Sequence, residues 1–271
     1  YMTDNYVIGE KVENIFYLTF NRPEKRNAIS FEMLDKMSKL VETVIMDRDI
    51  RVIIFKGEGN VFSAGIDFDS LGQLAGTFLN DVGGGGASIR AEIHRAQQVL
   101  NRLESIEVPI ICAIHGAAIG LGVEVTLACD IRLMSEDCIW SLPEAQFGLI
   151  ADLGGTARLS KLLGQSRAME ILMTTNRYSA QQALEWGLIN YLYPTKEALF
   201  EGAEKLAKDI IKSAPLAVGA FKKIIKRGEG VDLMTHLDME VSMQSIMIRS
   251  EDFKEGVDAL MNKRSPVWKR K

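Results

Sequence analysis

Cysteine and histidine are scarce in this chain: its 271 residues include three of each. The cysteines are odd in number and form no CxxC pair, which argues against a disulfide framework or a structural zinc site. The histidines show no HxxxH spacing, so the sequence gives no support to a metal-dependent enzyme. We expect no metal site, and free thiols in apolar stretches suit a reducing compartment such as the cytoplasm.

A marked excess of one charge is also missing. The formal net charge is −4, and charged residues make up 25% of the chain, the ordinary share for a soluble protein. Such a balance gives no general reason to bind nucleic acid or an anionic membrane surface. Hydrophobic residues make up 47%, which is ample for a core in one large domain or one domain with an appendage.

The sequence contains no segment typical of a membrane protein. Its first residues lack both the basic and the apolar region of a signal peptide, so a cytoplasmic location is expected. The nearly uncharged segment 108–125 is almost long enough to span a bilayer. It contains Pro109, three glycines and Glu124, however, and a buried strand, a glycine-rich turn and a helix start explain it better.

Strands and helices alternate in the first half of the chain. The β-rich or apolar runs at 14–20, 51–55 and 109–114 predict strands. Ser30 is placed to cap a helix whose apolar residues recur at helical spacing, and segment 91–106 has the same periodicity. This order predicts parallel, buried strands joined by crossovers, and hence an α/β fold.

Regular patterns lapse between Leu71 and Arg90, where four glycines follow one another from Gly83. We expect a surface loop there, either a flexible linker or a lid beside a binding site. From Gly202 onward the pattern is helical, and its methionines at helical spacing are typical of a core or a subunit interface. We therefore divide the chain into residues 1–200, which carry the site, and a helical region, 201–271.

Two glycine-centred turns follow buried strands. The first is segment 62–67, Phe-Ser-Ala-Gly-Ile-Asp, and the second is segment 115–124, His-Gly-Ala-Ala-Ile-Gly-Leu-Gly-Val-Glu. Glycine lets the backbone turn sharply and lets a ligand approach the amide N–H groups. Neither turn has the GKS or GKT of a P-loop or the GxGxxG of a dinucleotide site, so nucleotide binding is weakly supported. Close packing of two elements at the glycines is the structural alternative.

Three carboxylates lie in the second turn or in the stretch that follows it. If a helix starts near Gly120, Leu121 carries one of its first unpaired N–H groups and Glu124 faces the same side. A carboxylate beside a free amide donor can move a proton while the amide stabilises an oxyanion. Glu144 and Asp152 follow in apolar, glycine-rich surroundings. Solvent exposure or a salt bridge would explain any one of these acids, but the three together favour proton-transfer chemistry.

At these residues the sequence resembles the crotonase, or enoyl-CoA hydratase/isomerase, superfamily, with some features of its dienoyl-CoA isomerases. The matching blocks cover most of the chain in family order and spacing, and together they are specific. They are segments 21–28 (Asn-Arg-Pro-Glu-Lys-Arg-Asn-Ala), 62–67, 113–124, 128–131, 143–144, 154–159 (Gly-Gly-Thr-Ala-Arg-Leu) and 180–187.

The resemblance implies a core made of a spiral of ββα turns, followed by a helical C-terminal region that builds trimers, often paired into hexamers. It implies an acyl-CoA thioester as substrate and fatty acid metabolism, such as β-oxidation, as the setting. It implies no cofactor apart from the coenzyme A of the substrate, and no nucleic-acid or membrane partner.

The resemblance also implies site residues. The amides of Ile66 and Leu121 would form an oxyanion hole, and the catalytic acids would be Glu124, Glu144 and Asp152. The expected contacts with the coenzyme A part of the substrate are Lys25, Arg26, Ala28, Ala64, Gly65, Asp67, Phe68 and Gly120. Three lysines of the C-terminal region would either meet CoA phosphates in an oligomer or form a solvated helix face: Lys222, Lys223 and Lys226.

Departures from the family pattern leave two reactions open. Leu121 replaces the middle glycine of the usual Gly-Gly-Gly, but only its backbone amide is needed. Asp152 is typical of dienoyl-CoA isomerases, whereas Glu124 stands where those isomerases carry an aspartate. The leading prediction is hydration of a trans-2-enoyl-CoA by Glu124 and Glu144, and the alternative is Δ3,5-Δ2,4-dienoyl-CoA isomerisation by Glu144 and Asp152.

A function of another class also stays open. The chain could be a non-catalytic member of the family that binds acyl-CoA or RNA. The retained acids argue against a loss of catalysis, and the acidic balance argues against RNA.

Overall fold

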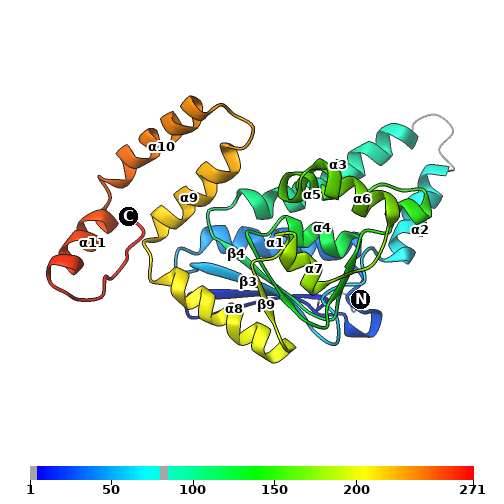
Figure 1. Ribbon diagram of the computed structural model, residues 1–271, viewed down its shortest axis with the longest axis horizontal. Helices are drawn as coiled ribbons and strands as arrows, with labels where there is room; N and C mark the ends of the chain where they lie inside the picture. The colour runs from blue at the N-terminus through cyan, green and yellow to red at the C-terminus, as the bar shows by residue number, and fades with distance from the viewer. Residues whose placement is uncertain (1–4, 80–84) are drawn as a thin grey trace.

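A six-stranded sheet lies at the centre of the computed structural model, which describes residues 5–79 and 85–271 (Figure 1). The strand order is β1-β2-β3-β4-β6-β9. The strands are β1 Val7–Val12, β2 Ile15–Phe20, β3 Val52–Gly57, β4 Ile110–Ile114, β6 Ile131–Ser135 and β9 Tyr191–Tyr193. Only β1 and β2 pair antiparallel, and every later pair in this sheet is parallel. The predicted parallel, buried strands are therefore confirmed.

A second, three-stranded sheet carries part of the chain that follows β4. Its order is β5-β7-β8, with bounds β5 Ala117–Ile119, β7 Ile139–Ser141 and β8 Tyr178–Ser179. Trp140 of β7 is fully buried, and its ring lies 5.1 Å from Tyr178 and 6.1 Å from Trp186 between centroids. This aromatic cluster packs on the small sheet, and β5 lies within the second glycine turn, directly before Gly120.

Helices cover both faces of the six-stranded sheet. The main core cluster includes buried side chains of α1 Phe31–Met46 and α3 Gly85–Ser105. The helix predicted after Ser30 is confirmed, because the Ser30 hydroxyl accepts a hydrogen bond from the Met33 amide at 3.3 Å. The opposite face is covered by α8 Lys196–Ile211, through Leu199, Ala203 and Ala207.

The remaining helices between β2 and β9 are shorter. They are η1 Pro23–Lys25, α2 Phe68–Leu79, α4 Leu121–Leu127, η2 Glu144–Phe147, α5 Gly155–Leu163, α6 Gln165–Thr174 and α7 Ala180–Glu185.

The loop predicted between Leu71 and Arg90 is wrong for most of its length. Helix α2 extends to Leu79, and α3 begins at Gly85. The side chain of Asp67 accepts a hydrogen bond from the Asp69 amide at 2.9 Å, and its carbonyl accepts one from Leu71 at 3.0 Å. These bonds start α2 in spite of the helix-weakening glycines that follow. Residues 80–84, and with them the first part of the glycine run, lie outside the described residues.

Three further helices complete the C-terminal region, and Figure 1 shows them extending to one side of the sheet. They are α9 Pro215–Arg227, α10 Leu233–Met247 and α11 Glu251–Met261. The division proposed at residue 200 falls inside α8, which packs on the sheet, so the part that projects from the sheet begins with α9. Within the described residues, no helix is both long and apolar enough to cross a membrane.

Candidate active site

The first glycine turn is held between two distant segments. Ser63 pairs with Ala118 in an isolated parallel bridge, and Ile29 pairs with Ile66 in another. Gly65 has φ +97°, and a β-carbon added there would lie 2.8 Å from the Ile119 carbonyl oxygen. Only glycine fits this backbone without strain. The bridges therefore fix the direction of the Ile66 amide.

The second glycine turn lies against the first. Gly120 has φ +51° and precedes Leu121, the first residue of α4. A β-carbon added at Gly65 would lie 3.8 Å from the Leu121 nitrogen, so the two turns adjoin. Among the hydrogen bonds of the described residues, none is donated by the amide of Ile66 or of Leu121. Two neighbouring backbone donors are thus available to a ligand oxygen.

Glu124 lies on the first turn of α4 and is almost completely buried, with 3% of its surface exposed. Its Oε1 accepts hydrogen bonds from the amides of Leu153 and Gly155, both at 2.8 Å. Burial raises the pKa of Glu124 to about 8; the charges of Glu144 and Asp152 add to the rise, and the two amides oppose it. This carboxyl is therefore able to hold a proton near neutral pH.

Glu144 begins η2 and faces the second glycine turn. A β-carbon added at Gly120 would lie 2.7 Å from Glu144 Oε1, so the absence of a side chain at Gly120 makes room for the carboxyl group. The other oxygen, Oε2, is buried and has no hydrogen-bond partner within the described residues. Burial raises the pKa of Glu144, and the charge of Asp152 adds to the rise. A buried carboxyl oxygen without a partner is typical of a group that binds a ligand or carries a proton.

Asp152 lies in the turn that leads into α5 and is partly buried. Its backbone carbonyl accepts a hydrogen bond from Gln97 Nε2 at 2.6 Å. Burial raises the pKa of the Asp152 carboxyl as well. The three candidate acids therefore lie close enough to act on one another's charge, and each takes up its proton more readily than a solvated carboxylate would.

The residues expected to contact coenzyme A lie in different settings. Lys25 is exposed and pairs with Asp69 at 2.7 Å, and Arg26 is exposed beside it. Ala28 and Ala64 are partly buried, and Phe68 is exposed with its ring edge-on to that of Phe147. These side chains therefore lie at or near the protein surface.

Asp67 differs from this expectation, because the structure turns it inward. Its exposed fraction is 4%, its carboxylate pairs with Arg22, and it accepts the Asp69 amide at the start of α2. Burial alone would raise its pKa, but the bond from Arg22 keeps the pKa below its usual value. Asp67 therefore shapes the turn and does not line an open path.

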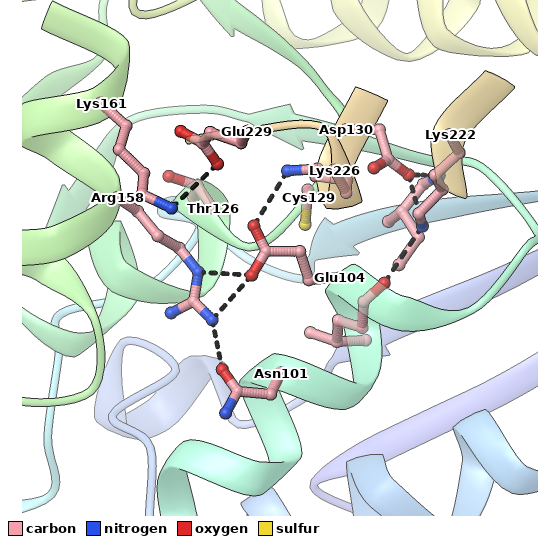
Figure 2. Close-up of polar contacts among 12 residues, drawn as sticks. Asn101, Glu104, Thr126, Cys129, Asp130, Arg158, Lys161, Lys222, Lys226 and Glu229 are labelled. Atoms are coloured by element: carbon pink, nitrogen blue, oxygen red, sulfur yellow. Dashed lines mark hydrogen bonds and ion pairs between the residues drawn. The ribbon is translucent and has the colours of Figure 1, made fainter. Parts of the chain in front are cut away.

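Of the three C-terminal lysines, Lys222 differs from both expectations, whereas Lys223 and Lys226 are partly exposed. Lys222 is buried, and its Nζ lies 2.7 Å from Asp130 and donates to the carbonyl oxygens of Leu103 and Val108, both at 3.1 Å (Figure 2). Lys223 pairs with Glu107 at 3.5 Å and Lys226 with Glu104 at 3.0 Å. Lys222 is thus fully occupied inside the protein and is unavailable to a phosphate.

Reasoning from the sequence missed the support around Glu124. The amide of Gly155 comes from the Gly-Gly-Thr-Ala-Arg-Leu block, and the amide of Leu153 comes from the residue directly before it. Two glycines directly after an apolar segment were the available signal for a backbone turn that binds an anion. Asn27, in the block 21–28, was also missed: its amide nitrogen donates to the carbonyls of Glu58 and Val61 at 2.8 and 2.9 Å. Within the described residues, no group of histidine, cysteine or acidic side chains has the arrangement of a metal site.

Comparison with known proteins places the chain in one family. A family model for enoyl-CoA hydratase/isomerase matches residues 10–271. The peroxisomal Δ(3,5)-Δ(2,4)-dienoyl-CoA isomerase of Arabidopsis thaliana is 35% identical, over 93% of this chain and 92% of its own length. A short-chain-enoyl-CoA hydratase of Clostridium acetobutylicum is 32% identical, over 96% of each chain.

Solved structures show the same fold. The crystal structure of an enoyl-CoA hydratase from Bacillus anthracis superposes with a TM-score of 0.90 and 30% sequence identity, over 98% of this chain and 100% of that one. The crotonase-type α/β core and the helical C-terminal region expected from the sequence are thereby confirmed. The chain belongs to the enoyl-CoA hydratase/isomerase family of the crotonase superfamily, as an enzyme of the hydratase or isomerase class.

Proposed function

We propose that the protein adds water to a trans-2-enoyl-CoA thioester. The observation that carries the proposal is the meeting of two unbonded backbone amides, at Ile66 and Leu121, with the buried carboxyl group of Glu124 and the partly buried one of Glu144. The two N–H groups would polarise the thioester carbonyl and stabilise the enolate that forms when water attacks C3. Such donors stabilise a developing negative charge more strongly in the low dielectric of a protein than they would in water.

The proton balance of hydration fits one proton shared by Glu124 and Glu144. One of the two, as the carboxylate, takes a proton from water while the oxygen bonds to C3. The other, as the carboxylic acid, delivers its proton to C2 as the enolate collapses, and the pair is left with the one proton that it had. The pKa of Glu124, about 8, supports the presence of that proton near neutral pH, and burial raises the pKa of Glu144 as well.

Isomerisation of a 3,5-dienoyl-CoA to the 2,4-dienoyl-CoA is the second candidate. It is supported by Asp152, which is partly buried and has a raised pKa, and by the 35% identity to an enzyme named for that reaction. In this reaction Glu144 and Asp152 would remove a proton from one carbon of the acyl chain and return one to another, with the same amides holding the dienolate.

A panel of thioesters with three variants separates the two reactions. The substrates are crotonyl-CoA and a 3,5-dienoyl-CoA, and the variants are Glu124→Gln, Glu144→Gln and Asp152→Asn, with the exposed Glu170→Gln as a matched control. Full hydratase activity in Glu144→Gln would refute the proposed mechanism. Loss of isomerisation with hydration intact in Asp152→Asn would make the protein an isomerase, and binding of acyl-CoA without turnover would support a non-catalytic role.

We further propose that α9, α10 and α11 join copies of the chain into a trimer or a dimer of trimers. No side chain of α10 is buried, and the three helices expose large apolar residues around a groove of about 1060 Å³. Such exposure in a single chain is typical of an interface. The proposed substrate brings its own coenzyme A, and no other cofactor is needed for either reaction. A cytoplasmic location stays a prediction, since relatives include enzymes named peroxisomal and mitochondrial.

A further inference from the structure

The turn that holds Glu124 is itself held by a buried arginine. Arg158, on α5, donates from Nη1 to the carbonyl oxygen of Leu153 at 3.0 Å. Its backbone amide donates to the carbonyl of Gly154 at 2.8 Å. Gly154 has φ +107°, and a β-carbon added there would lie 1.9 Å from Arg158 Nη1, so the guanidinium fills the space that glycine leaves. Arg158 thus contacts the turn 153–155 in two ways, through a hydrogen bond to Leu153 and through packing against Gly154.

The same turn supplies both hydrogen bonds to Glu124. The amide of Leu153 and the amide of Gly155 each donate to Oε1 at 2.8 Å. Leu153 is therefore bonded at both ends of its backbone, by Glu124 through the amide and by Arg158 through the carbonyl. A shift of the guanidinium would tilt the turn and change the direction of both donors.

A carboxylate from another helix fixes the guanidinium in turn. Arg158 Nε and Nη2 both lie 3.0 Å from Glu104 Oε2, and Nη2 also donates to Asn101 at 2.7 Å (Figure 2). Lys226 of α9 binds the other oxygen of Glu104 at 3.0 Å. Burial alone would raise the pKa of Glu104, but the bonds from Lys226 and Arg158 keep that pKa below its usual value. Only 10% of the Arg158 side chain is exposed, so screening by water is weak.

We propose that Arg158 is a positioning residue for the carboxyl group of Glu124, and that Glu104 holds Arg158 in place. The proposal rests on the proton-transfer role proposed for Glu124. An arginine is costly to bury, and an apolar side chain of similar length would fill the same volume at lower cost. An apolar side chain could not replace the N–H donors of the guanidinium, which have a fixed geometry. These donors bind the turn 153–155 and α3 simultaneously and so join the two.

The catalytic consequence follows from the hydrogen bonds to Glu124. Bonds to the carboxylate favour the charged form, so a turn that drifts away would raise the pKa of Glu124 further. When a pair of carboxyl groups must hold one proton, the rate has a bell-shaped pH profile, and its alkaline limb marks the loss of the last proton. Loosening the turn should therefore lower kcat and move that limb to higher pH.

The test compares Arg158→Met, Arg158→Lys and Glu104→Gln with Lys161→Met. Lys161 is a matched control, because it lies one turn along the same helix and forms an exposed pair with Glu229 at 2.9 Å. The kinetic readout is the pH profile of kcat and KM with crotonyl-CoA and a dienoyl-CoA. The direct readout is the titration of the Glu124 carboxyl by NMR in protein labelled with 13C-glutamate, assigned by its absence in Glu124→Gln.

We expect Arg158→Met to lower kcat about tenfold or more with little change in KM, because the substrate contacts remain. The alkaline limb and the Glu124 titration should both move to higher pH, with smaller shifts in Arg158→Lys and Glu104→Gln and none in Lys161→Met. If Arg158→Met does not fold, Glu104→Gln and Arg158→Lys decide the question.

Arg158 and Glu104 variants whose kcat and Glu124 titration match those of Lys161→Met would overturn the proposal. A wild-type protein that turns over no thioester would instead refute the proposed function. In that case the NMR titration still decides whether Arg158 positions Glu124, because it needs no substrate.

Discussion

Replacing Glu124 by glutamine is expected to stabilise the fold while it removes proton transfer. Burial raises the pKa of this carboxyl to about 8, and the nearby acids add to the rise. In the unfolded chain the carboxyl ionises at its usual value of 4.5. Over the interval between these two values, the folded state retains a proton that the unfolded state has released.

The size of the effect follows from that interval. A tenfold change in an equilibrium constant corresponds to about 1.4 kcal/mol. The difference between pKa values of 4.5 and about 8 therefore lowers the free energy of unfolding of the wild type by ~5 kcal/mol above pH 8 and by ~3 kcal/mol at pH 7. The stability that comes from the neutral carboxyl is fully present below pH 4.5 and is lost as the pH rises through about 8. Glutamine is uncharged at every pH, and its oxygen can accept the same two amides.

Urea unfolding measures the difference in the free energy of unfolding between wild type and Glu124→Gln. The measurement is made at about pH 5.5, 7 and 9 and at one protein concentration. The variant should be the more stable protein, by ~1 kcal/mol at the lowest pH and by ~5 kcal/mol at the highest. Glu170→Gln, on the exposed face of α6, reports the general effect of removing one acid. A stability difference for Glu124→Gln that does not change with pH would refute the raised pKa of Glu124.

Gly65→Ala should lower the free energy of unfolding by ~2 kcal/mol or more and should also lower kcat, because the new β-carbon would lie 2.8 Å from the Ile119 oxygen at φ +97°. Thermal unfolding and a crotonyl-CoA assay measure the two effects. A variant that matches the wild type in both would show that the turn can relax. Lys222→Met should cost ~3 kcal/mol in urea unfolding, because it leaves the buried Asp130 carboxylate without its cation. The Lys222→Met/Asp130→Asn double variant should recover part of that loss, and no recovery would mean that the pair is not coupled. Leu260→Glu, at a side chain of α11 that is 79% exposed, should shift the assembly towards single chains in light scattering, and an unchanged mass would exclude this face from the interface.

The elements that the sequence predicted correctly depend on local patterns. The helix after Ser30 follows from a cap and an apolar stripe that lie within sixteen residues, and the central strands follow from short apolar runs. The loop predicted between Leu71 and Arg90 failed because glycine content was weighed above the cap that Asp67 provides. The cap itself depends on Arg22, which binds the same carboxylate from 45 residues away and is not visible in a local pattern.

The site was predictable in part for a similar reason. A helix start at Leu121 with Glu124 one turn on is a local feature, and the structure contains it. The approach of the two glycine turns requires isolated bridges between distant segments, which spacing alone does not predict, so the pairing of Ile66 with Leu121 came from resemblance. Lys222 was misjudged because its burial depends on Asp130, a partner that only the folded chain brings within reach.

Asp152 has a second effect that bears on how its variants are read. Its negative charge raises the pKa of Glu124, so Asp152→Asn should lower that pKa and move the alkaline limb of hydration to lower pH. A loss of hydration measured only at alkaline pH would therefore imitate a direct role in proton transfer. The full pH profile separates the two cases, because a shifted limb leaves the rate at the optimum nearly unchanged. An isomerisation rate that falls at every pH, beside a hydration rate that recovers at lower pH, would assign Asp152 to isomerisation.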